Sequence, residues 1–282
     1  MPICKLYRNG STLGVAPRMT NPNPVKRSTI TGWSARSARS QRVWFYSIEV
    51  DKLTGYGFSF TLTIRDCPSS PDKFHAMRDA FIKRLRRDGS VRTHWLIEWQ
   101  RRQVPHFHGC VYFDPSVNIE LIEEKIINHW CAVSNAYTSA PFAQKVLPIY
   151  ETVGWLKYLA KHGARGVNHY QRSNDNIPPG WVKTGRMWGY TGDWPIGKPS
   201  RIELDYDGYY VLRRIQRRWA ISEARKRYEY SNIVKSRQLL KCNDKDRSKF
   251  IGVSLWIPSE LMTLMVAFVA SMGYKIHRQS VD

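Results

Sequence analysis

Two neighbouring segments, residues 94–100 and 106–113, alternate in side-chain character with the period of a β-strand. Because only a short polar stretch separates them, they pair as an antiparallel hairpin, which we expect to fold about Gln103. One face of this hairpin is apolar and belongs to a core. Its residues are Trp95, Ile97, Trp99, Phe107, Val111 and Phe113.

The opposite face of the hairpin gathers groups that bind divalent metal ions. In the expected register Glu98 faces His108 and Gln100 faces His106, with Cβ atoms about 4.5–5.5 Å apart. Two histidines and a carboxylate hold a divalent ion and leave positions open for a phosphate oxygen. His94 shares this face but lies roughly 13 Å from Glu98 at strand rise, so we interpret it as DNA-facing or simply polar. We expect Glu98, His106 and His108 to bind Mg²⁺ or Mn²⁺, unless both histidines are structural.

The segments around the hairpin predict an α+β fold. Structure begins at Val43–Val50, a β-branched and aromatic run. The later elements are a strand at 58–64, a helix from Ser70-Pro71 to Gly89, the hairpin, a helix at 118–132, a short strand at 145–150 and a helix that Thr152 caps. This order predicts an antiparallel sheet with helices on one face, in a ferredoxin-like (RRM-like) layout.

Composition divides the chain into three parts. Residues 1–41 are rich in Pro, Ser, Asn and Arg, and we expect a basic, poorly ordered arm. Residues 42–200 form the domain that contains the hairpin. Residues 201–282 form a basic helical extension, with a long helix from Asp207 to about Tyr230 whose apolar face is Val211, Ile215 and Trp219. The apolar run 250–273 is broken by Pro258 and Glu260, so we expect a packing or partner-binding helix and no membrane span.

Charge and cysteine content bound the function classes. Lys and Arg number 44 against 23 Asp and Glu, a net charge of +21. That surplus favours a polyanionic partner, above all nucleic acid, over a membrane surface or mere solubility. The five cysteines include no CxxC pair, which argues against a disulfide scaffold or a cysteine-rich zinc site; Cys110 is interpreted as a small buried residue. Without a secretory signal, we expect a cytoplasmic protein.

The helix that begins at Thr152 carries a candidate nucleophile. Its apolar stripe is formed by Val153, Leu156, Leu159 and Ala160. Tyr158 and Lys161 are three residues apart on the other side and are therefore neighbours. A lysine favours the phenolate form of a nearby tyrosine. Most exposed Tyr–Lys pairs, however, are surface residues without a catalytic role.

Four motifs taken together resemble the HUH endonuclease superfamily, and in particular the replication initiators of filamentous phages and small rolling-circle plasmids. The resemblance covers about Val43 to Asp193. The motifs, in chain order, are Phe60-Thr-Leu-Thr63, Pro105-His-Phe-His108 with Glu98 on the preceding strand, Tyr158-x-x-Lys161, and Arg186-Met-Trp-Gly189.

The resemblance implies both the fold of an HUH nuclease and its reaction. Tyr158 would attack a scissile phosphate at the metal site and form a 5′-phosphotyrosyl link. The released 3′-OH would prime synthesis, and reversal would rejoin the strand. Single-stranded origin DNA is then the partner, with helicase and polymerase supplied by a bacterial host. We further expect DNA contacts from Thr61, Thr63, Gln100, Arg186, Trp188, Arg213 and Arg217.

Other functions compete with this interpretation. Residues 192–199 approach a phosphate-binding loop, but Pro199 replaces the Ser or Thr that would hold Mg²⁺, so we expect no ATP binding. A transposase or conjugative relaxase of the same superfamily is one alternative, although relaxases place the tyrosine before the histidines. A DNA-binding regulator without catalysis is another.

Overall fold

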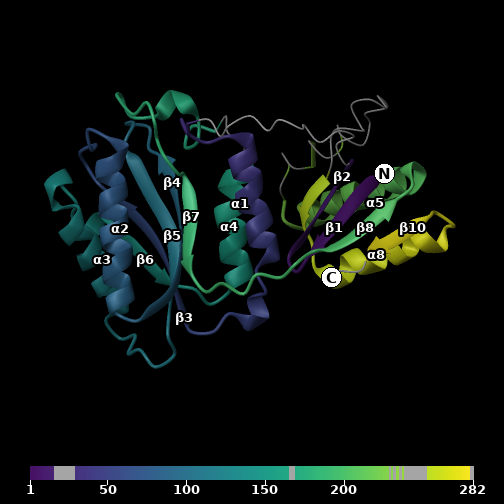
Figure 1. Ribbon diagram of the computed structural model, residues 1–282, viewed down its shortest axis with the longest axis horizontal. Coiled ribbons are helices and arrows are strands. Elements are labelled where there is room, and N and C mark those ends of the chain that lie inside the picture. The colour runs from purple at the N-terminus through teal and green to yellow at the C-terminus, as the bar shows by residue number, and fades with distance from the viewer. Residues whose placement is uncertain are drawn as a thin grey trace. The chain divides into compact units, whose positions relative to one another are not determined.

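The computed structural model describes residues 1–15, 29–164, 169–228, 230, 233, 234, 237 and 253–279. The chain divides into two compact units, each drawn in Figure 1. The central unit comprises Lys26–Arg42 and Val50–Pro195. The terminal unit comprises Met1–Val25, Val43–Glu49 and Ile196–Asp282.

The central unit contains a five-stranded antiparallel sheet in the order β6-β3-β5-β4-β7. Its strands are β3 (Tyr56–Thr63), β4 (Ser90–Trp99), β5 (Pro105–Phe113), β6 (Lys145–Pro148) and β7 (Trp188–Gly192). The first four strands of that order have the ferredoxin-like arrangement, in which β3 and β4 flank β5, so the predicted α+β antiparallel fold is confirmed. The added edge strand β7 was not predicted.

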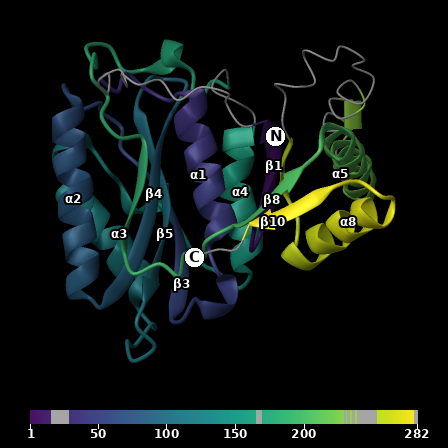
Figure 2. The ribbon, with the colours of Figure 1, turned by 45° about the vertical axis from the view of Figure 1, so that its right-hand side comes forward.

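Helices cover both faces of this sheet, whereas we expected them on one face. Helices α2 (Pro71–Arg87) and α3 (Ile122–Val133) lie on one side, and α4 (Thr152–Ala164) lies on the other (Figures 1 and 2). Ser70 caps α2 as predicted, because its hydroxyl accepts the backbone N–H of Lys73. The run at Val43–Val50 ends helix α1 (Ala35–Ser47), and is not a strand. Short 3₁₀ turns lie at Val50–Lys52, Asn135–Tyr137, Pro141–Ala143 and Asn174–Asn176.

Aromatic side chains form the core between the sheet and α2 and α3. Phe107 on β5 is fully buried at its centre. Its ring centroid lies 5.4–6.4 Å from those of Phe60, Phe74, Phe81, Trp95 and Trp130. The predicted apolar face of the hairpin is therefore confirmed as core.

Phe107→Ala is expected to destabilise the central unit by about 3–5 kcal/mol, because it leaves a large cavity among these rings. Urea unfolding followed by tryptophan fluorescence measures the loss, since Trp95 and Trp130 border the cavity. Phe142→Ala is the matched control: this side chain is 92% exposed, and its loss should change stability by less than about 0.5 kcal/mol.

The terminal unit contains a second five-stranded antiparallel sheet, in the order β10-β8-β1-β2-β9. Its strands are β1 (Pro2–Tyr7), β2 (Gly10–Val15), β8 (Ser200–Leu204), β9 (Val253–Trp256) and β10 (Ile276–Gln279). The expected poorly ordered arm is therefore wrong for residues 2–15, which form the hairpin β1–β2 inside this sheet. The expectation of a helical extension at 201–282 is also wrong. This segment contains both helices and strands, because β8, β9 and β10 belong to the sheet.

Two helices, α5 (Tyr206–Lys226) and α8 (Ser259–Ser271), pack together against this sheet (Figure 2). The buried cluster between them consists of Cys4, Leu13, Ile202, Leu204, Tyr209, Leu212, Val253, Ile257, Met262, Met265, Val266 and Val269. The predicted apolar face of α5, with Val211, Ile215 and Trp219, only borders this cluster.

The apolar segment near the C-terminus is part of this core. Met262, Met265, Val266 and Val269 of α8 are buried. This confirms the expectation of a packing helix. In the described parts of the chain, no helix combines the length and the apolar character that crossing a bilayer requires.

Candidate active site

The hairpin of β4 and β5 sets the geometry of the site. Glu98 pairs with His106 and Leu96 pairs with His108, so the register differs by two residues from the expected one. The cause is a tighter turn, in which Gln100 N–H donates to the carbonyl of Val104 at 2.9 Å. A shift of two residues leaves every side chain on its predicted face. Glu98, His106 and His108 therefore still share one face.

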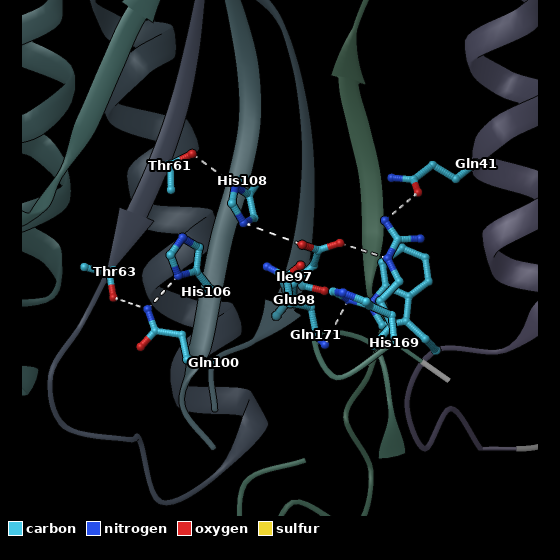
Figure 3. Close-up of polar contacts among 12 residues, drawn as sticks. Gln41, Thr61, Thr63, Ile97, Glu98, Gln100, His106, His108, His169 and Gln171 are labelled. Atoms are coloured by element: carbon cyan, nitrogen blue, oxygen red, sulfur yellow. Dashed lines mark hydrogen bonds and ion pairs between the residues drawn. The ribbon is translucent and has the colours of Figure 1, made fainter. Parts of the chain in front are cut away.

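On this face, the two imidazoles stand side by side, as Figure 3 shows. The ring centroids of His106 and His108 are 4.4 Å apart, and the two rings stack with an angle of 28° between their planes. Glu98 reaches diagonally from β4, which brings its Oε2 to 3.6 Å from Nε2 of His108. Nδ1 of His108 lies 3.0 Å from Thr61 Oγ1, and Gln100 Nε2 donates to Nδ1 of His106 at 2.6 Å.

The bonding pattern of His108 suits a metal-binding histidine. A histidine that binds a metal through one ring nitrogen usually donates its other ring N–H, which fixes the ring. Nδ1 of His108 can donate to Thr61 Oγ1, and its Nε2 is then suited to a metal. Nδ1 of His106 instead accepts from Gln100, which also donates to Thr63 Oγ1 at 2.7 Å, so the neutral ring of His106 carries its proton on Nε2. His106 would therefore have to exchange this hydrogen bond to bind a metal through Nε2.

Glu98, His106 and His108 have the donor atoms that a divalent ion requires. The distance between Glu98 and His108 also suits such an ion. Ligand atoms that share an ion stand roughly 3 Å apart when each bond is about 2.1 Å. The 3.6 Å between Glu98 Oε2 and His108 Nε2 is close to that separation. No group of three His, Cys, Asp or Glu side chains within the described ranges forms a preassembled cluster, so His106 would have to adjust to complete the set.

The side chains of the site differ in how far they are exposed to solvent. Glu98 is 1% exposed and His108 is 6% exposed, whereas His106, Thr61 and Gln100 are half-buried. The site therefore lies where the interior of the central unit meets its surface, at the end of the hairpin that contains the turn.

His94 does not face DNA, contrary to one expectation. Its side chain is 0% exposed, and its ring lies 6.3 Å from that of Trp188. Burial, with a smaller effect of the Arg172 charge, lowers the pKa of His94 to about 3, so the ring is neutral. Cys110 is a small buried residue as expected, and burial raises the pKa of its thiol to about 12, which disfavours a thiolate ligand.

Arg172 is a site residue that the sequence did not reveal. Its Nε donates to Glu98 Oε1 at 2.9 Å, and both side chains are at most 1% exposed. Its guanidinium also stacks on Trp33 and bonds to Gln41. These residues come from loops and a helix far apart in the chain, and no spacing rule connects them.

Helix α4 lies over the same face of the sheet as the histidines. Thr152 Oγ1 is 3.1 Å from Tyr112 Oη, and the indole of Trp155 lies beside the thiol of Cys110. Along β5, these contacts step from residue 112 to residue 110, which is toward His108. The axis of α4 therefore runs along β5 toward the histidine pair.

Tyr158 follows one turn further along α4. Its ring stacks on Trp155, with centroids 5.2 Å apart, and its side chain is 46% exposed. This agrees with the predicted position away from the apolar stripe, since Leu156 and Leu159 are buried. Lys161 lies within α4, but its side chain is outside the residues that the structure describes.

The remaining predicted DNA contacts divide into three groups. Arg186 is exposed and Trp188 is half-buried on β7, where it pairs with Leu96 in the same cross-strand row as His108. Thr61 and Gln100 bond to the histidines, and Thr63 bonds to Gln100, as described above. In the terminal unit, Arg213 is only 8% exposed, which argues against its expected contact with DNA. Burial and the charge of Arg213 lower the pKa of Arg217 to about 10.

The chain matches one family model across the segment that builds this site. Residues 58–163 match the model of the replication-associated protein ORF2/G2P. This segment runs from β3 to α4 and includes all three predicted metal ligands and Tyr158. No solved structure matches the chain closely enough for comparison.

Curated relatives match nearly the whole chain, including the terminal unit. The replication-associated protein G2P of Pseudomonas phage Pf3 is 41% identical over 279 residues, which is 98% of this chain and 99% of the relative. A putative replication protein of Xylella fastidiosa strain 9a5c is 38% identical over 98% of this chain and 99% of the relative. A putative replication protein of Xylella fastidiosa strain Temecula1 is 40% identical over 91% of this chain and 99% of the relative.

These matches define the chain as a replication initiator, and they confirm the predicted resemblance to rolling-circle initiators. The chain belongs to the replication-associated protein ORF2/G2P family. The likeness extends beyond Asp193, where the sequence motifs had stopped.

Proposed function

We propose that this initiator nicks and rejoins one DNA strand at a replication origin, with Tyr158 as nucleophile and a divalent ion held by Glu98, His106 and His108. The observation that carries the proposal is the shared face of the sheet. Glu98 and His108 approach to 3.6 Å there, and α4 runs along the same face toward them.

The chemistry follows from the residues on that face. A bound Mg²⁺ or Mn²⁺ supplies Lewis-acid polarisation of the scissile phosphate. Tyr158 Oη attacks the phosphorus and loses its proton to solvent, while the bond to the 3′-oxygen breaks and that oxygen takes up a proton. The products are a 5′-phosphotyrosyl link and a free 3′-OH. Attack by a 3′-OH on this link reverses the step and rejoins the strand.

Several residues are suited to hold the DNA strand near this site. Arg186 can contact a phosphate, and Trp188 can stack on an unpaired base. The net charge of +21 supports a DNA partner along more of the surface. The proposal leaves unwinding and synthesis to a helicase and a polymerase of a bacterial host, in whose cytoplasm the initiator would act.

Metal removal tests the proposal at the level of activity. Single-stranded DNA that contains the cognate origin should be cleaved in Mn²⁺, and excess EDTA should reduce the rate at least about 100-fold, because the polarising charge is lost. Added Mn²⁺ should restore it. Cleavage that proceeds unchanged in EDTA would exclude the metal part of the proposal and favour a regulator whose two histidines are structural.

The hydrogen bonds to the histidines give a finer prediction. Thr61→Val removes the partner of His108 Nδ1, and we expect Mn²⁺ affinity to fall about 10-fold, near the lower end of the effect of such partners. Isothermal titration calorimetry measures this affinity. Ser59→Ala is the matched control, because Ser59 also lies on β3 but bonds to the carbonyl of Leu147. Equal affinities for the two variants would contradict the assigned role of Thr61.

A further inference from the structure

We infer that Arg172 is a positioning residue that holds one oxygen of Glu98 so that the other oxygen is presented to the metal. This inference rests on the proposed metal site. It adds a residue outside the predicted ligand set and specifies how Glu98 binds, through a single oxygen.

The two carboxylate oxygens of Glu98 have different partners. Arg172 Nε donates to Oε1 at 2.9 Å, while Oε2 points toward His108 Nε2 at 3.6 Å (Figure 3). An ionised hydrogen bond of this kind is among the stronger contacts in a protein interior. With Oε1 bonded to the guanidinium, Oε2 is the oxygen that faces His108 and that Glu98 offers to an ion.

The guanidinium is itself fixed by its surroundings. It lies 3.9 Å from the ring centroid of Trp33, within cation–π range, and its Nη2 donates to Gln41 Oε1 at 3.4 Å. Trp33 is anchored in turn, because its Nε1 donates to the carbonyl of Ile97 at 2.8 Å. Ile97 directly precedes Glu98 on β4. The arginine, its supports and the carboxylate thus form one connected group.

The loop that carries Arg172 also follows the helix that carries Tyr158. The backbone N–H of Trp99 donates to the carbonyl of Gln171 at 2.8 Å, which ties this loop to the end of β4. Only residues 165–168 separate Ala164, the end of α4, from His169, where the described loop begins. The loop that fixes Glu98 therefore follows α4 closely in the sequence.

A purely structural ion pair is the competing explanation. Burying an Arg–Glu pair commonly gives little net stability, because removing both charges from water costs about as much as their attraction returns. Removing one partner is costly under either explanation. Stability alone therefore does not separate the two, whereas metal affinity does.

A double-mutant cycle on metal binding tests the inference. Isothermal titration calorimetry with Mn²⁺ is applied to the full chain, to Arg172→Met, to Glu98→Gln and to the double variant, with folding checked by circular dichroism. We expect Arg172→Met to weaken binding at least about 10-fold in the wild-type background, the size typical of groups that orient a ligand. In the Glu98→Gln background the same change should have less than about a 2-fold effect. Equal losses in both backgrounds would overturn the inference.

A milder pair of variants keeps the test decisive if Arg172→Met does not fold. Arg172→Lys retains the charge but not the side-on donor geometry, and Gln41→Leu removes only a support of the guanidinium. Both should weaken Mn²⁺ binding, Arg172→Lys by more than Gln41→Leu. Unchanged binding in Arg172→Lys would overturn the inference and leave the proposed metal site intact. A wild-type chain that binds no Mn²⁺ would instead overturn the site and the inference together.

Discussion

Tyr158→Phe is expected to abolish the covalent protein–DNA adduct while leaving DNA binding unchanged within about 2-fold. The substitution removes only the phenolic oxygen, so the phosphate loses its nucleophile while the ring can still stack on Trp155. Removal of a nucleophile commonly costs about 10⁴-fold or more in rate. The adduct is measured on denaturing gels with labelled origin DNA, and binding by fluorescence anisotropy.

Tyr150→Phe is the matched control for this variant. Tyr150 lies just before α4 and is 93% exposed, so the substitution is chemically identical and structurally harmless. Adduct formation should stay at the wild-type level. If Tyr158→Phe formed the adduct and Tyr150→Phe did not, the nucleophile would be misassigned, although the metal site could still be correct.

His108→Ala is expected to produce the second large effect, a loss of Mn²⁺ affinity and of cleavage by at least about 100-fold. This loss is at or above the upper end, about 100-fold, of the loss expected when only a hydrogen-bonding partner of a ligand is removed. The side chain is buried beside Glu98, so no other described histidine is placed to substitute for it without movement of the strand. Calorimetry gives the affinity and the nicking assay gives the rate.

His129→Gln separates this effect from the general loss of a histidine. His129 lies on α3, on the other side of the sheet, and pairs with Asp88 at 2.6 Å. It should bind Mn²⁺ like the wild type. A His108→Ala protein that keeps full Mn²⁺ affinity would show that the histidine pair is structural.

The sequence predicted the central unit well because its signals are local. The strand expected at 58–64 corresponds to β3, the Ser70-Pro71 cap begins α2, and the strand expected at 106–113 corresponds to β5, Pro105–Phe113. The hairpin register was wrong by two residues, because it depends on the turn, in which Gln103 adopts a positive φ of 57°. The predicted face survived because strand side chains repeat with period two.

The terminal unit and part of the site depend on pairings that local patterns do not encode. β1 pairs with β8 although the whole central unit separates them in sequence. The polar and basic residues after β2 made residues 1–41 resemble an arm. The contact between Arg172 and Glu98 joins residues 74 positions apart, and a lone arginine in a loop carries no signal of its partner.

The predicted orientation of helix α5 was wrong for a different reason. A basic helix with an apolar stripe predicts exposed arginines, but Arg213 is buried, and the observed core side is formed by Tyr209, Leu212 and Gln216. Residue type alone does not give the orientation of a helix whose sequence mixes aromatic and basic residues on several sides.

Mapping the DNA-linked residue by mass spectrometry tests the central claim most directly. Wild-type protein is incubated with origin DNA and Mn²⁺, the DNA is trimmed by nuclease, and the chain is cut after glutamate, so that one peptide begins at Thr152. Tandem fragmentation should place the nucleotide on Tyr158. A nucleotide found on any other tyrosine, such as Tyr170 in the same peptide, would contradict the account.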